Sequence, residues 1–126
     1  MPRGFTLLEI LLVMALIGLL ASVSYPLYTH HLLGVRRHHA HIILWTIALQ
    51  METYYNAHNS YEGASLTALP TSTEIDHYQL RLQVTDSQHY RLQAIPIGTQ
   101  TKDPCGTLEL TERGPELSPA SSTECG

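Results

Sequence analysis

The stretch Gly4–Val13, GFTLLEILLV, decides the fold because it opens a long apolar helix and places one carboxylate inside it. From Ile10 to Thr29 the chain carries no Asp, Glu, Lys or Arg. A bare charge in hydrocarbon costs about 2.5–3.5 kcal/mol on the mildest insertion scales. We therefore expect Glu9 to gain a partner in an assembled state, which would make this segment an assembly element as well as an anchor.

Three interpretations of the segment Phe5–Tyr28 compete, and its helix of about 36 Å is long enough to cross a bilayer. A cleaved secretory signal would use residues 10–20 as its apolar region, but Val23 is a poor end for the usual small-residue cleavage site. An ordinary single-pass anchor leaves Glu9 unexplained. An anchor that is re-used for packing between subunits explains the acid.

Apolar residues continue beyond the membrane-like segment at the spacing of an amphipathic helix. Members of this stripe recur every three or four positions: Ala40, Leu44, Ile47, Met51 and Tyr55. Proline within a helix breaks or kinks it, so we expect a bend near Pro26. We predict one long helix from Phe5 to about His58, stopped by Asn59.

The C-terminal half of the chain changes to the period of a β-strand. Residues 78–85 and 90–94 alternate apolar and polar side chains around a turn at 86–88, and residues 107–111 predict a third strand. Such a sheet has one apolar face, and the stripe of the helix can cover it. The predicted fold class is α+β, with a long bent N-terminal helix packed on a small three- to four-stranded antiparallel sheet.

Composition limits the function classes. The two cysteines, Cys105 and Cys125, suggest a disulfide in an exported protein, worth about 3 kcal/mol, rather than two free thiols in a cytosolic one. Residues 59–126 carry nine acidic against four basic side chains, which disfavours binding to nucleic acid. We find no nucleophile with a base, no phosphate-binding glycine loop and no paired carboxylates, so we predict neither an enzyme nor a cofactor.

The segment Gly4–Ala21 resembles the class III signal of a type IV prepilin almost residue by residue. The resemblance extends more loosely through the order of elements, and it implies cleavage between Gly4 and Phe5 by a prepilin peptidase, with N-methylation of Phe5. It also implies that Glu9 pairs with the N-terminal amine of a neighbouring subunit. Further family positions that this chain matches are the helix-softening residues Gly18 and Pro26 and the disulfide pair Cys105 and Cys125 that bounds a C-terminal loop.

The resemblance also implies an organisation and a location. Residues 1–4 would be the leader, 5–28 the transmembrane and assembly half of the helix, 29–58 its amphipathic half and 59–126 the head, which forms one domain with 29–58. The chain would wait in the bacterial inner membrane with a periplasmic head, then enter an extracellular pilus. Its partners would be other pilins, the peptidase, the inner-membrane assembly platform and membrane lipid.

The short chain resembles minor pilins in particular. The expected function is therefore that of a minor type IV pilin, a structural subunit or a priming or tip component for twitching motility, adhesion or DNA uptake. The alternative is a pseudopilin of a type II secretion system, which shares the signal and the helix. Because the head is acidic, we expect no nucleic acid as a partner.

A cluster of histidines is not a general trait of the family: His30, His31, His38, His39 and His41. Spacings of three and seven residues place some of them near one helix face, where imidazoles bind transition metals. No acidic or cysteine ligand is near in sequence, so we predict no metal and interpret the cluster as a solvated, weakly basic face. Arg36 and Arg37 within it would meet anionic lipid headgroups where the helix leaves a bilayer.

Overall fold

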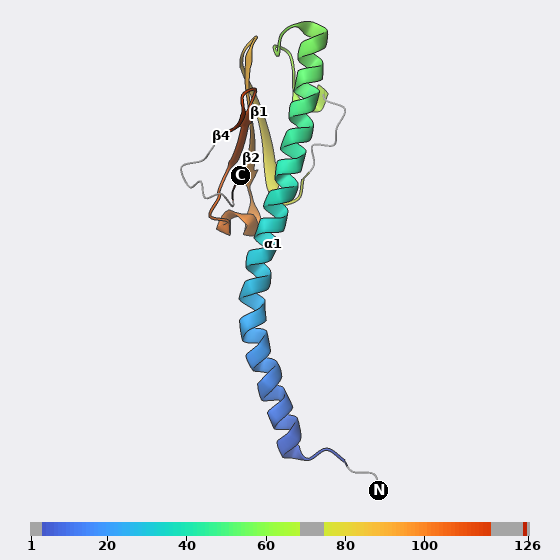
Figure 1. Ribbon diagram of the computed structural model, residues 1–126, viewed down its shortest axis with the longest axis vertical. Coiled ribbons are helices and arrows are strands. Elements are labelled where there is room, and N and C mark those ends of the chain that lie inside the picture. Colours follow the sequence, from blue (N-terminus) through green and yellow to red (C-terminus); the bar gives the residue numbers. More distant parts are fainter. Residues whose placement is uncertain (1–3, 69–74, 117–124, 126) are drawn as a thin grey trace. The chain divides into compact units, whose positions relative to one another are not determined.

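The computed structural model describes residues 4–68, 75–116 and 125. The chain divides into two compact units, Met1–Leu32 and Leu33–Gly126. The elements are α1 (Leu7–His58), β1 (Tyr78–Asp86), β2 (His89–Pro96), β3 (Leu108–Thr111), β4 (Gly114–Glu116) and the 3-10 helices η1 (Leu66–Ala68) and η2 (Gly98–Lys102). The predicted α+β class is confirmed (Figure 1).

Helix α1 is 52 residues long and continues through Pro26. Proline has no N–H to donate to the backbone hydrogen bonds of a helix. One turn after Pro26, the hydroxyl of Thr29 donates to the Pro26 carbonyl at 3.0 Å. The bend near Pro26 stays a prediction. Asn59 ends the helix as expected: its φ is 54°, a left-handed conformation that Asn tolerates, and its N–H donates to the Tyr55 carbonyl at 2.6 Å.

The sheet is antiparallel throughout, in the order β1-β2-β3-β4. Leu82 pairs with Leu92, and Leu92 with Leu110, so the three leucines form a row across one face. The sequence predicted three of the strands within one or two residues. It did not place β4, whose three residues include Pro115, because proline is tolerated only at the edge of a sheet and reads as a turn.

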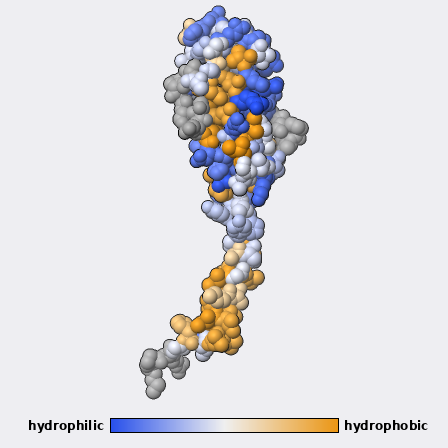
Figure 2. Space-filling model, turned by 180° about the vertical axis from the view of Figure 1, so that it is seen from behind, coloured by the Kyte–Doolittle hydropathy of each residue, from blue (hydrophilic) through white to orange (hydrophobic). Residues whose placement is uncertain are grey.

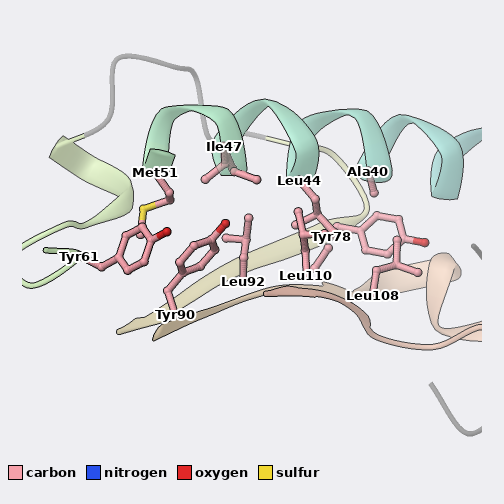
Figure 3. Packing of buried hydrophobic residues seen from close by; sticks show 12 residues of the cluster. Ala40, Leu44, Ile47, Met51, Tyr61, Tyr78, Tyr90, Leu92, Leu108 and Leu110 are labelled. Carbon is pink, nitrogen blue, oxygen red and sulfur yellow. The ribbon is translucent and has the colours of Figure 1, made fainter. Parts of the chain in front are cut away.

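The core lies between the predicted stripe of α1 and the leucine face of the sheet (Figure 3). Within the Leu33–Gly126 unit, Leu44, Ile47 and Met51 from the helix are at most 1% exposed, as is Leu92 from β2. Tyr61 and Tyr90 close the end of this core, with ring centroids 4.8 Å apart in an edge-to-face arrangement. The helix stripe is therefore the cover that the sheet needs.

The predicted disulfide is present and joins Cys105 to Cys125 with the two α-carbons 5.7 Å apart. A second contact holds the same chain end: Nε2–H of His41 donates to the Cys125 carbonyl at 2.8 Å. Cys125 is thus linked to the loop before β3 by the disulfide and to α1 by the hydrogen bond.

We expect the double substitution Cys105→Ser and Cys125→Ser to lower the free energy of unfolding of the head by about 3 kcal/mol, because the crosslink restricts the unfolded chain. Urea unfolding of the full chain in detergent, followed by near-ultraviolet circular dichroism, measures this change. Equal midpoints for the variant and the parent protein would contradict it.

Two tyrosines make the head sensitive to alkali. Burial, followed by the hydrogen bond to Glu52, raises the pKa of Tyr61 above 10.0, and burial raises the pKa of Tyr90 to about 12. A raised pKa means that the stability contributed by the neutral phenols is fully present below pH 10 and is lost as pH rises towards about 12. Ultraviolet titration should show a late class of tyrosines coincident with unfolding, and uniform titration near pH 10 would contradict this.

Candidate functional site

The start of α1 holds Glu9 in a local hydrogen-bonded arrangement. Thr6 precedes the first helical residue and accepts the Glu9 N–H on its hydroxyl at 3.2 Å, while Oε2 of Glu9 accepts the Thr6 N–H at 3.2 Å. This reciprocal pair is a capping box, which satisfies N–H groups that the first helical turn leaves free. The sequence interpretation missed it, although the signal, a threonine three residues before a glutamate, was visible.

The apolar half of α1 has no partner within the described chain. Its membrane-like window is 0% buried, and by length and composition α1 is long enough and apolar enough to cross a membrane. Figure 2 shows this half as the hydrophobic end of the helix. Phe5 precedes the helix and is 84% exposed. Gly18 has open space around it, and Gly4 likewise, so neither glycine is required by packing in the single chain.

A second apolar surface lies on the part of α1 that carries the head. Residues spaced by seven, three and four positions form an outward stripe opposite the buried one: Val35, Ile42, Trp45 and Leu49. Each is about half exposed or more, and Leu49 is 68% exposed. Four large apolar side chains in one row, away from the core of their own domain, form a surface that fits a protein or membrane partner.

A buried polar network fastens η2 to α1 at the base of the head. Nη1 of Arg37 donates to Oδ1 of Asp103 at 2.7 Å, and the Asp103 side chain is fully buried. Nε2 of Gln100 lies 3.0 Å from the Leu33 carbonyl, 3.0 Å from the Tyr78 hydroxyl and 3.2 Å from Oδ2 of Asp103.

The network also sets the position of the disulfide. Oδ1 of Asp103 accepts the backbone N–H of Cys105 at 3.2 Å, so one carboxylate joins the helix cation to the start of the C-terminal loop. Burial raises the pKa of the Tyr78 phenol, which keeps its hydroxyl neutral and available for hydrogen bonding. Arg37 and Asp103 are 66 residues apart, so the spacing of residues in the sequence could not predict this ion pair.

The histidine cluster does not act as a unit. His30, His31, His38 and His39 are exposed, whereas His41 is half-buried against the Cys125 carbonyl. Within residues 4–68, 75–116 and 125, no three His, Cys, Asp or Glu side chains are placed to hold a metal ion. Arg36 and Arg37 have separate roles: Arg37 is in the buried pair, and Nη1 of Arg36 donates to the Thr99 hydroxyl at 3.2 Å.

The outward face of the sheet is polar and carries its cations on β1 and β2. On β1 every second side chain is exposed, and these are Gln79, Arg81, Gln83 and Thr85. Arg91 of β2 pairs with Glu109 of β3 at 2.6 Å. Arg81 has no acidic partner among the described residues, so its guanidinium is available to an anionic ligand.

Comparisons with known protein families match two adjoining parts of the chain. The family described as "Type IV minor pilin ComP, DNA uptake sequence receptor" matches residues 26–109, and the prokaryotic N-terminal methylation motif matches residues 2–25. A fimbrial protein of Neisseria meningitidis serogroup B (strain ATCC BAA-335 / MC58) is 30% identical over 76 residues, which span 60% of this chain and 45% of that protein.

A solved structure supports the same likeness. The type IV pilin from Shewanella oneidensis superposes with a TM-score of 0.59 and 27% identity, over 71% of this chain and 94% of that one. This structural likeness covers 71% of the chain, and the N-terminal motif is matched separately over residues 2–25.

Proposed function

This chain belongs to the family of type IV minor pilins described by ComP, and from that premise we propose that it waits in the inner membrane and then enters a pilus through α1. It is a minor type IV pilin, and the matches favour this over a secretion pseudopilin. Its family and fold are structural. In this proposal the peptidase cleaves between Gly4 and Phe5, Phe5 becomes the N-methylated first residue, and the head faces the periplasm until assembly.

The observation that carries the proposal is the unburied apolar surface of α1. A window of the helix that is 0% buried cannot remain in water, because about 25 cal/mol is lost for each Å² of apolar surface left exposed. A bilayer covers this surface before assembly, and the helices of neighbouring subunits cover it afterwards. The outward stripe of Val35, Ile42, Trp45 and Leu49 extends the apolar contact surface into the head-bearing half of the helix.

In this proposal Glu9 serves two partners. Both hydrogen bonds from Thr6 end on Oε2, at 3.2 and 3.4 Å, and no described group bonds to Oε1. The carboxylate can therefore keep its capping role and still accept the N-terminal amine of an adjacent subunit. In an apolar filament interior the amine and carboxylate neutralise one another, and such a pair sets register more than it adds stability.

Two substitutions test the charge of Glu9 and the helix cap formed with Thr6 separately. Glu9→Gln removes the charge but keeps a side chain that suits a capping box, whereas Thr6→Ala removes the cap, worth about 1 kcal/mol, and keeps the charge. We expect Glu9→Gln to impair incorporation into sheared pili strongly and Thr6→Ala to leave it nearly unchanged. Immunoblots of sheared and cell fractions measure both.

Mass spectrometry of the mature N-terminus is the control, since both variants should be cleaved before Phe5 and methylated there. Normal incorporation of Glu9→Gln would contradict the pairing. Equal impairment of both variants would mean that Glu9 acts only by capping the start of the helix.

A second candidate function is DNA binding, and the description of the matching family as a DNA uptake sequence receptor favours it. The charge count that argued against nucleic acid was taken over the whole head. Arg81 and Arg91 are the cations of β1 and β2 on the outward face, whereas the acids lie at the end of β1, where Asp86 contacts His89, and on β3, where Glu109 contacts Arg91. We infer that this face, with its exposed glutamines, would contact the DNA backbone through Arg81.

Removal of Arg81 tests this candidate. Fluorescence anisotropy of labelled duplex DNA with the full chain in detergent should show weaker binding by Arg81→Ala and a salt slope lower by about 0.9, the value for one phosphate contact. Arg36→Ala is the matched control, because its guanidinium lies at the base of the head. An unchanged slope for Arg81→Ala, or no binding by the parent protein, would contradict the candidate.

A further inference from the structure

We propose that Arg36 and Lys102 form a basic collar at the base of the head that binds the phosphate headgroups of anionic lipid while the chain waits in the membrane. The inference rests on the membrane-embedded state proposed above and adds a ligand that the pilin assignment does not supply. Its occupant is the bilayer surface.

The geometry of η2 brings the side chains of Arg36 and Lys102 to the same side of η2. Gln100 and Asp103 hold η2 against α1 through the Leu33 carbonyl and Arg37, and Thr99 accepts a hydrogen bond from Arg36. In a 3-10 helix, residues three apart are eclipsed, so Lys102 projects on the same side of η2 as Thr99. The fold therefore places Lys102 on the side of η2 that meets Arg36, although 66 residues separate them in sequence.

The charges at this place are not neutralised within the described chain. Asp103 is the acid nearest to Lys102 in sequence, and it is buried in its pair with Arg37. Neither Arg36 nor Lys102 forms an ion pair with a described residue, and Lys102 is exposed. A guanidinium and an ammonium at one edge present the donors that bind phosphate oxygens.

The helical residue of the collar follows the membrane-like segment closely in sequence. Arg36 follows Tyr28 by eight residues, about 12 Å of helix. The stretch between them contains the polar residues His30 and His31 as well as Leu32 and Leu33, a mixture that suits the membrane interface. Arg81, on the outward face of the sheet, belongs to a different surface.

Native mass spectrometry of the full chain tests the collar. The protein is released from micelles that contain equal amounts of phosphatidylglycerol and phosphatidylcholine, and retained lipid is counted. We expect the parent protein to prefer phosphatidylglycerol and the preference to fall about fivefold for each collar cation removed, as for a basic residue near an anionic surface. The double variant Arg36→Ala, Lys102→Ala should lose most of it.

The control is Arg113→Ala, which removes an exposed cation from the head and should keep the preference. Because both collar side chains lie outside the core, the double variant should fold, and Lys102→Glu provides a second test by reversing one charge. No preference in the parent protein, or an equal preference in the collar variant, would overturn the inference. Loss of the chain from alkali-washed membranes would instead refute the membrane state itself.

Discussion

The burial of one face of α1 against the sheet is the interaction on which the rest of the structure depends. A sheet with one apolar face must bury that face against another element, and here Leu44, Ile47 and Met51 of the helix cover it. Each such side chain contributes about 1.5–3 kcal/mol when fully buried. The same helix therefore completes the head with one face and leaves its remaining apolar surface unburied, which is the surface that the proposed function uses for assembly.

The polar network at the base of the head has a different purpose from the core. Removing one partner from a buried ion pair costs about 3–5 kcal/mol, yet replacing the whole pair by apolar residues is often neutral. The Arg37–Asp103 pair, at 2.7 Å, is thus better explained by geometry than by stability. It fixes η2 on the helix and Cys105 at the start of the C-terminal loop, so that both are placed relative to the same helical turn.

Periodicity predicted the parts of this fold that depend on local pattern. The stripe of α1, the stop at Asn59 and the alternation of β1 and β2 follow from side-chain spacing and one tolerated left-handed residue. What the sequence could not reveal depends on distant partners or on very short elements. The contact of Gln100 with the Leu33 carbonyl spans 67 residues, and β4 is three residues long.

Glu9 shows how one residue satisfies two physical demands. In hydrocarbon a carboxylate without a partner is unfavourable, which made it appear to require another subunit. The capping box with Thr6 gives the charge a partner already in the single chain, at the helix end where the dipole favours an acid. An acid that serves the cap with one oxygen remains ordered at the end of the helix. In the proposed pairing between subunits, the other carboxylate oxygen would accept the incoming amine without new ordering of this side chain.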